Sequence, residues 1–272
     1  MHLHCTGSGC PTVVLEPGAG EMSSYLGWIA PAVARDTRVC VYDRAGRGWS
    51  ESADGPQDGT RIATDLHTLL QRGGVPGPYV LAGHSFGGLY VLTFAAQYPE
   101  DVAGLVLVDS TAPAADATPN VSAGSYDIMG RVSAVVAASA RFGTARVLGQ
   151  ASYRGLPPQS RGEARASMAT ASQVGSTVDE YVTANASMSE AQSLVDFAGG
   201  PLIVLTAGQG SSAGWFAKQD AMAALSSNSL HRVVAGATHA SMLEGQHAAA
   251  AVTRAIADVV ASVRTGTLLT TP

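Results

Sequence analysis

Short apolar runs recur along the chain, and helix-like stretches separate them. Tyr79–Gly83 and Leu202–Thr206 are apolar at almost every position. A strand with one face in water alternates apolar and polar side chains, so an unbroken apolar run indicates a strand buried on both faces of a mostly parallel sheet. On this basis we expect strands at Thr12–Glu16, Arg38–Asp43, Tyr79–Gly83, Leu105–Asp109, Leu202–Thr206 and His231–Ala235.

The stretches between these runs have the character of helices. They are Tyr25–Ala34, Arg61–Arg72, Gly87–Tyr98, Gln219–Leu225 and, at the end of the chain, Gln246–Val263. Pro99 ends the third of them, because proline lacks the amide hydrogen that a helix interior needs. Regular alternation of strand and helix predicts an α/β fold with a mostly parallel central sheet flanked by helices.

One segment interrupts the alternation. Between Thr111 and Gly200 we find no convincing strand, and helix-like periodicity occurs near Ile128–Leu148, Ser160–Ser172 and Thr177–Leu194. A flexible linker would not carry this periodicity. We therefore predict a helical cap or lid at residues 111–199, inserted into a core formed by residues 1–110 and 200–272.

Composition narrows the range of partners. Hydrophobic residues make up 46% of the 272 residues, charged residues 14%, and the formal net charge is −5. This is enough apolar surface for a core, and the absence of a basic run argues against nucleic acid and anionic membranes as partners. No run of about 18 apolar residues predicts a transmembrane helix. The first residues lack the features of a signal peptide, which leaves a cytoplasmic protein or an exported one whose signal has been removed.

The cysteines and the first histidines allow several interpretations. Cys40 lies in an apolar run and is expected to be a buried, small hydrophobic residue. Cys5 and Cys10 could form a disulfide or remain two thiols, and their spacing does not decide between these. We interpret His2 and His4 as part of a first strand with alternating side chains, and we expect no metal site there.

The strongest chemical motif is Gly83-His84-Ser85-Phe86-Gly87. It matches the G-x-S-x-G nucleophile elbow, in which a serine on a strained strand-to-helix turn is lifted above the sheet edge. Glycine is needed on both flanks because a side chain there would collide with the neighbouring strand or helix. An apolar run precedes the motif and a helix-like stretch follows it, so we predict Ser85 as the nucleophile.

A serine nucleophile requires a base and an acid. His239 follows the last predicted strand and precedes the last helix, a position from which a loop histidine reaches the sheet edge. In this fold the acid lies between the serine and the histidine in the chain. The loop at residues 207–212 contains no carboxylate, and Asp220 comes too late. We favour Asp109, at the end of the strand next to the nucleophile's, over Glu190 and Asp196 in the predicted cap.

Backbone amides and pocket side chains complete the predicted site. The amide of Phe86 should stabilise an oxyanion, with Ala19 as the second donor and Gly20 as the next choice. Small residues at Gly18 and Gly20 would let the backbone approach a substrate closely. His84 is expected to be structural or to line the pocket. Among cap residues, Tyr126 and Met129 are candidates for the substrate pocket, and no cofactor or metal is needed.

Five segments together resemble the α/β-hydrolase superfamily over nearly the whole chain. They are Glu16–Gly20, Asp43–Ser50, Gly83–Gly88, Leu105–Asp109 and Gly236–His239. In place of the superfamily's common His-Gly pair at the oxyanion loop, this chain has Pro17-Gly18.

The resemblance implies a cap-bearing serine hydrolase, in which the segment Asp43–Ser50 is mainly structural. Similar members place their acid where Asp109 lies. A serine nucleophile argues against the superfamily's dehalogenases and epoxide hydrolases, which use an aspartate there. The superfamily contains enzymes of many specificities and some receptors.

We therefore expect hydrolysis of a small to medium, partly apolar carboxylic ester through an acyl-enzyme intermediate. Lactone or amide hydrolysis, and acyl transfer or perhydrolysis without a cofactor, are alternatives that would use the same three side chains. A ligand-binding protein without catalysis on the same fold is a further alternative.

Overall fold

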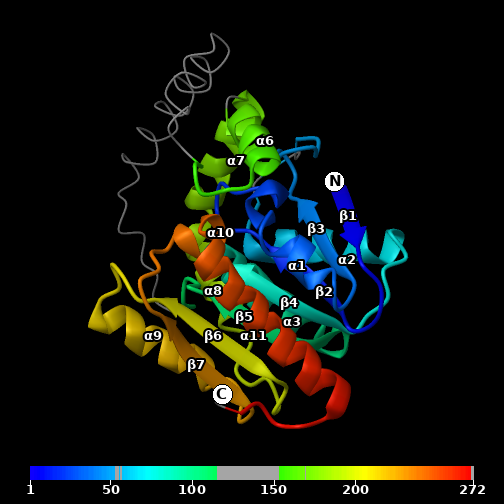
Figure 1. Ribbon diagram of the computed structural model, residues 1–272. Coiled ribbons are helices and arrows are strands. Elements are labelled where there is room, and N and C mark those ends of the chain that lie inside the picture. The colour runs from blue at the N-terminus through cyan, green and yellow to red at the C-terminus, as the bar shows by residue number, and fades with distance from the viewer. Residues whose placement is uncertain (53–54, 56, 115–152, 169, 271–272) are drawn as a thin grey trace.

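The computed structural model describes residues 1–52, 55, 57–114, 153–168 and 170–270. A seven-stranded sheet occupies the centre of the molecule, in the order β1-β3-β2-β4-β5-β6-β7 (Figure 1). β1 is antiparallel to β3, and the other neighbouring strands are parallel. The strands are β1 (His2–Thr6), β2 (Thr12–Glu16), β3 (Val39–Asp43), β4 (Tyr79–His84), β5 (Val102–Val108), β6 (Leu202–Ala207) and β7 (Ser229–Val234).

Helices cover both faces of this sheet. Those before β5 are η1 (Ser23–Leu26), α1 (Ala30–Val33), α2 (Gly59–Arg72), α3 (Phe86–Gln97) and η2 (Pro99–Asp101). The later ones are α6 (Pro158–Met168), α7 (Ala171–Val182), α8 (Ala184–Ala191), α9 (Ala213–Ala223), α10 (Ser241–Glu244) and α11 (Gln246–Thr265). None of the described helices combines the length and the hydropathy that crossing a bilayer requires.

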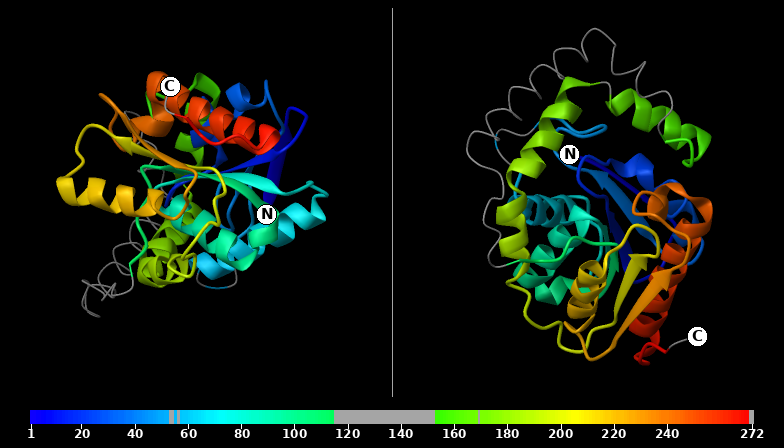
Figure 2. Two further views of the ribbon diagram at one scale, coloured as in Figure 1. Left: turned by 90° about the horizontal axis from the view of Figure 1, so that it is seen from below. Right: turned by 90° about the vertical axis from the view of Figure 1, so that its left-hand side faces the viewer.

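The core is divided into two layers by the sheet, as the unbroken apolar runs predict. Val13 and Leu15 face the layer that contains α1 and α11, whereas Val14 faces the layer of α2, α3 and α9. Figure 2 shows α11 and α2 on opposite faces of the sheet. Each fully buried aliphatic side chain contributes about 1.5–3 kcal/mol, so the two layers supply most of the stability of the fold. The predicted α/β fold with a mostly parallel sheet is confirmed.

Two helix predictions were wrong in their bounds. The stretch Tyr25–Ala34 is not one helix but the short elements η1 and α1, because Pro31 in the first turn of α1 cannot donate the hydrogen bond that a continuous helix needs. The helix predicted at Gln219–Leu225 begins earlier, at Ala213. Ser212 caps it by accepting a hydrogen bond from the amide of Trp215 at 3.2 Å.

Three helices lie between β5 and β6 in the part of the chain that the structure describes. They are α6, α7 and α8, and the helix predicted near Ile128–Leu148 lies outside the described residues. α8 packs against α2 and α3, while α6 contacts η1. α6 and α7 lie at the top of the molecule in Figure 1. The division into a core at 1–110 and 200–272 and a cap at 111–199 stays a prediction.

The interpretation of the cysteines was wrong. Cys40 is buried as expected, but it forms a disulfide with Cys5. The antiparallel register of β1 and β3 places these two residues directly opposite each other, with their Cα atoms 4.1 Å apart. Cys10 is an exposed free thiol rather than the partner of Cys5. Residues His2–Thr6 form β1, so the prediction of a first strand at this position is confirmed.

Candidate active site

The carboxyl ends of the parallel strands meet at one edge of the sheet, and the candidate residues follow these ends. Ser85 comes directly after β4, and Asp109 directly after β5. The pairing of β4 with β5 sets His84 opposite Val108, so the residues that follow these two are neighbours although they are far apart in the sequence. His239 reaches the same edge from the loop after β7.

Ser85 has the strained backbone that the elbow motif predicts. Its φ is 54° and its ψ is −121°, a combination that L-residues with a side chain rarely adopt. A Cβ atom on Gly83 would lie 2.4 Å from the carbonyl oxygen of Gly87, and one on Gly87 would lie 2.4 Å from the carbonyl oxygen of Glu16. Both flanking positions therefore exclude a side chain, as the elbow motif predicts.

Asp109 and His239 form a short hydrogen bond. Asp109 Oδ2 lies 2.6 Å from His239 Nδ1, and the carboxylate side chain is 3% exposed, whereas the imidazole is 49% exposed. The second oxygen, Oδ1, accepts from the amide of Ala207 at 3.1 Å and from Trp215 Nε1 at 2.9 Å. Burial alone would raise the pKa of Asp109, but these three donors outweigh it and hold the pKa below its ordinary value.

The rival carboxylates are engaged elsewhere. Glu190 Oε2 accepts from the amide of Thr60 at 2.9 Å, at the start of α2. Asp196 Oδ1 accepts from the amide of Ala198 at 2.9 Å. Asp220 lies in α9, as expected, and its Oδ1 is 2.6 Å from Nδ1 of another histidine, His231. The geometry therefore places Asp109, among these four, against His239.

The hydroxyl of Ser85 makes no hydrogen bond to His239 or to any other residue that the structure describes. His84 directly precedes Ser85 in the chain, and its ring centroid lies 4.6 Å from that of His239. Hydrogen bonds between a nucleophile and its base are often long before substrate binds and tighten in the complex. Ser85 and the His239–Asp109 pair thus lie at the same edge of the sheet, but Ser85 and His239 are not hydrogen-bonded to each other in this structure.

The loop after β2 runs beside Ser85. A Cβ atom on Gly18 would lie 3.0 Å from the Cβ of Ser85 and 2.9 Å from Glu21 Oε2, so a side chain at this position would have to displace its neighbours. The amide of Gly18 donates to Glu21 Oε2 at 2.5 Å, and the amide of Gly20 donates to Glu180 Oε2 at 3.0 Å. Within the described chain, no group accepts a hydrogen bond from the amides of Ala19 and Phe86. These two amides are therefore free to face a ligand.

A buried ionic cluster, here called the Arg44 cluster, supports this loop. It consists of Glu16, Arg44, Arg47 and Glu180, each with a side chain no more than 2% exposed. Arg44 bridges the two glutamates, with Nη1 2.5 Å from Glu16 Oε1 and Nε 2.7 Å from Glu180 Oε1. Arg47 Nη2 lies 2.7 Å from Glu180 Oε2. Burial raises the pKa of Glu16 to about 7, despite Arg44 and the hydroxyl of Tyr42.

The Arg44 cluster connects three parts of the chain. Arg44 follows β3, Glu180 belongs to α7, and Arg44 also donates to the carbonyl oxygens of Pro17 at 2.8 Å and Gly18 at 2.6 Å. The family resemblance implies a mainly structural role for the segment Asp43–Ser50, but the sequence does not reveal this cluster. The two arginines of that segment were a signal, yet their partner Glu180 lies too far along the chain to be found from spacing.

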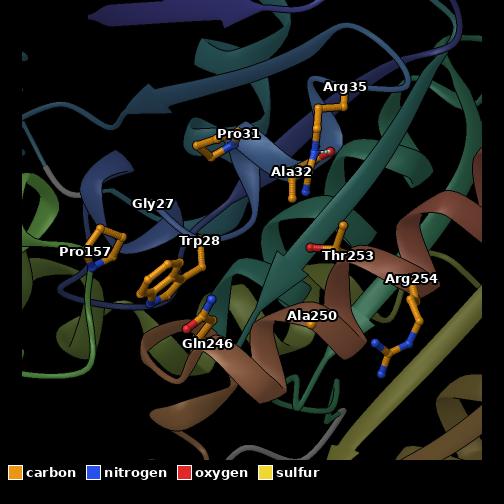
Figure 3. A pocket seen from close by; sticks show the side chains of 10 residues that line it. All are labelled: Gly27, Trp28, Pro31, Ala32, Arg35, Pro157, Gln246, Ala250, Thr253 and Arg254. Carbon is orange, nitrogen blue, oxygen red and sulfur yellow. Dashed lines mark hydrogen bonds between the residues drawn. The ribbon is translucent and has the colours of Figure 1, made fainter.

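One surface hollow borders the candidate residues, and another lies away from them. One of about 590 Å³ borders Asp109 and His239 and is lined also by Trp215 and the loop 209–212. The other, of about 640 Å³, lies between α1 and α11, with Trp28 and Gln246 at one end and Arg35 and Arg254 toward the other (Figure 3). Among the described residues, no carboxylate, histidine or serine lines the second hollow, so it does not hold the chemistry assembled at the sheet edge.

A strained serine at a strand-to-helix turn, on a mostly parallel sheet covered by helices on both faces, defines the α/β-hydrolase class of fold. The family model of the alpha/beta hydrolase fold matches residues 11–246, and the chain belongs to this family.

Solved structures of the same fold resemble the chain over nearly its full length. A thermophilic esterase from Thermogutta terrifontis is 24% identical, with a TM-score of 0.70 over 97% of this chain and 94% of that one. The enol-lactonase from Burkholderia xenovorans LB400 is 19% identical, with a TM-score of 0.69 over 96% of each chain. At these sequence identities, the likeness shows a shared fold alone.

Similarity to curated relatives is confined to part of each chain. A protein of Schizosaccharomyces pombe is 34% identical over 139 residues, which are 40% of this chain and 26% of the relative. RutD of Cronobacter sakazakii, named as a candidate carbamate hydrolase, is 38% identical over 106 residues, which are 37% of this chain and 38% of RutD. The matches thus span roughly a quarter to two-fifths of these relatives.

Proposed function

We propose that this protein is a serine hydrolase that cleaves a carboxylic ester through an acyl-enzyme intermediate. One observation carries the proposal. The strained Ser85 lies at the carboxyl end of β4, at the same edge of the sheet as His239, whose Nδ1 is 2.6 Å from the buried carboxylate of Asp109. A nucleophile, a base and a group that orients the base are the three parts that acyl transfer requires.

Each of the three side chains has a defined step. Ser85 Oγ attacks the carbonyl carbon of the ester while His239 Nε2 accepts the hydroxyl proton. The alcohol leaves with that proton, and the acyl group stays on Ser85 Oγ. A water molecule then attacks the acyl-enzyme as His239 accepts one of its protons, and His239 returns this proton to Ser85 Oγ as the acid leaves. Asp109 holds the proton on His239 Nδ1 and stabilises the imidazolium without taking the proton itself.

Two backbone amides stabilise the negative charge on the carbonyl oxygen. Phe86 begins α3, and its amide points out of the amino-terminal end of the helix, where the helix dipole favours an anion. Ala19 is the second donor, because the neighbouring amides of Gly18 and Gly20 are already bonded to Glu21 and Glu180. The close packing of Gly18 against Ser85 supports the placement of this loop at the reacting carbonyl.

An aromatic pair gives the proposed pocket its apolar character. The ring of Phe86 lies 5.4 Å from that of Tyr181, which belongs to α7 and is 51% exposed. An exposed aromatic side chain over the residue next to the nucleophile fits a small to medium, partly apolar acyl or alcohol group. Tyr126 and Met129, also predicted for the pocket, lie outside the described residues. We retain residues 111–199 as the proposed cap.

Lactone cleavage is the second candidate, because a lactone is an internal ester and needs the same groups. The structural likeness to an enol-lactonase favours it among the alternatives. Amides and carbamates form a third class, suggested by the partial similarity to RutD. A panel of p-nitrophenyl esters of increasing acyl length, set against lactones, amides and carbamates, separates these classes and measures the size of the pocket.

A serine-directed fluorophosphonate probe tests the nucleophile directly. We expect covalent labelling of the folded protein at Ser85, and no labelling of the Ser85→Ala variant. The same probe must label a control esterase under identical conditions. If Ser85 stays unmodified while the control reacts, the protein is a binding protein on this fold rather than an enzyme.

A further inference from the structure

Glu21 and His84 form an ion pair immediately beside Ser85 that the proposed reaction leaves without a role. Glu21 Oε2 lies 3.0 Å from His84 Nδ1, and the two side chains are 17% and 2% exposed. His84 belongs to β4 and directly precedes Ser85, whereas Glu21 follows the loop that contains Ala19. The pair therefore lies between the two loops that border the nucleophile.

The hydrogen bonds of His84 define its protonation. Its Nδ1 faces the carboxylate of Glu21, and its Nε2 lies 3.2 Å from the carbonyl oxygen of His239. Both partners are acceptors, and Glu21 Oε2 also accepts from the amide of Gly18. A neutral imidazole has one N–H and could satisfy one of the two. Both ring nitrogens must therefore donate, which makes His84 an imidazolium.

The charges around His84 support this state. Burial alone would lower the pKa of His84, but the Glu21 carboxylate, the carbonyl of His239 and the charge of Asp109 raise it above the ordinary value. Burial alone would raise the pKa of Glu21, whereas His84, the amide of Gly18 and His239 lower it below the ordinary value. Burial raises the pKa of Glu244, and the charges of Glu21 and His84 also act on this carboxyl, Glu21 raising its pKa and His84 lowering it.

We propose that Glu21 and the imidazolium of His84 are positioning residues that fix both sides of the active site of the proposed hydrolase. Through the amide of Gly18, Glu21 holds the loop whose next residue, Ala19, is the proposed oxyanion donor. Through the carbonyl of His239, His84 holds the backbone of the proposed base. This inference rests on the proposed function, since it assigns these loops to oxyanion binding and proton transfer. A displacement of such groups by about 1 Å is enough to lower a rate 100-fold.

The variants Glu21→Gln and His84→Asn test the role in catalysis. We expect the rate constant of fluorophosphonate labelling and kcat for an ester to fall about 10–100-fold, with little change in KM, because the loops are misplaced in the transition state. His67→Asn is the matched control. His67 Nε2 also pairs with a carboxylate, Asp101 Oδ2 at 3.1 Å, but this pair lies at the amino end of β5, the opposite edge of the sheet. Labelling of folded Glu21→Gln within twofold of the unmodified protein would overturn the proposal.

The pH profile separates positioning from packing. Loss of the His84 proton should lower activity on the alkaline side, and this limb should move to lower pH in Glu21→Gln, because the carboxylate that raises the pKa of His84 is gone. A structural role alone would lower activity equally at every pH. An alkaline limb that stays in place in folded Glu21→Gln contradicts the proposal.

Histidine NMR decides the charge without any assay of activity. In protein with ¹³C-labelled histidines, the His84 signal is identified by its absence from His84→Asn. We expect this imidazole to titrate with a midpoint above about 6.5, and this midpoint to fall in Glu21→Gln. If His84 is neutral at pH 6 in protein whose Ser85 is labelled, the positioning proposal fails and the proposed function stands. If the His84 midpoint is high but Ser85 does not react with the probe, the proposed function fails and the positioning role fails with it. Only the ion pair between Glu21 and a charged His84 would then be supported.

Discussion

The indole Nε1 of Trp215 donates a hydrogen bond to Oδ1 of Asp109 at 2.9 Å, across 106 residues of chain. The other oxygen of the same carboxylate is bonded to His239, so the aspartate is held from two sides. Trp215 lies in the first turn of α9, the helix that begins earlier than the sequence predicts. The tryptophan thus restrains the orientation of the group that orients the proposed base.

The Trp215→Phe variant should lose this bond while retaining most of the packing. A hydrogen bond to a charged group contributes about 1.5–3 kcal/mol, so we expect a loss of this order in the free energy of unfolding at pH 7. The pKa of Asp109 is lowered in the folded protein, so this stabilisation is present above the unfolded pKa of about 3.9 and disappears as pH falls through the folded pKa. Urea denaturation from pH 7 to below the unfolded pKa checks this: a difference that does not shrink as pH falls below about 3.9 would assign the loss to packing.

Asp109→Asn should lower kcat by a factor of about 10³–10⁴ with folding intact, because the proposed base would lose the acceptor that fixes its tautomer. The control is Asp220→Asn, which removes a carboxylate 2.6 Å from another histidine, His231, and should leave kcat within a few-fold. Kinetics with a p-nitrophenyl ester and circular dichroism of each variant provide the measurement. Near-full activity of Asp109→Asn, with loss in Glu190 or Asp196 variants, would assign the acid elsewhere.

Glu180→Gln should destabilise the protein strongly, since it leaves the buried guanidinium groups of Arg44 and Arg47 without one charge partner. Removing one member of a buried ion pair costs about 3–5 kcal/mol, which guanidinium denaturation can measure. Asp179→Asn is the matched control, because Asp179 is the adjacent residue of α7 and is exposed. Equal effects of the two substitutions would show that the Arg44 cluster does not hold α7 to the core.

Gly87→Ala should disturb the elbow, since the new Cβ atom would lie 2.4 Å from the backbone carbonyl of Glu16, which cannot move without displacing β2. Such overpacking costs about 1–3 kcal/mol, and labelling of Ser85 should fall with it. Gly175→Ala is the contrasting change in α7, where a Cβ would meet nothing within 4 Å. It should stabilise by about 0.5–1 kcal/mol through helix propensity. Thermal unfolding of both variants tests the two signs.

The strands and the elbow could be predicted because their information is local. An unbroken apolar run such as Tyr79–Gly83 is compatible with few environments other than a doubly covered strand, and Gly83 is required by the carbonyl of Gly87 four residues on. The need for glycine at position 87 comes from the backbone of Glu16 on the neighbouring strand, but the motif itself already predicts it. The position of His239 followed from the order of elements, since the loop after the last strand reaches the same sheet edge. These features can be predicted because a local motif or the order of the elements indicates each of them.

Contacts between distant segments could not be predicted in this way. The disulfide of Cys5 with Cys40 depends on β1 pairing antiparallel to β3, and this pairing leaves no mark on the spacing of the cysteines. The contact of Asp109 with His239 spans 130 residues, and elimination could favour this aspartate but could not place it.

The same division explains why Trp215, Glu21 and Glu180 were missed. Each acts through a partner brought near by the packing of loops and helices on the carboxyl edge of the sheet, and none carries a motif of its own. Local sequence dictates which backbone a segment adopts, because propensity and burial act over a few residues. Which side chains then meet is decided by the order and register of the strands, because these set the distances between residues that the chain keeps far apart.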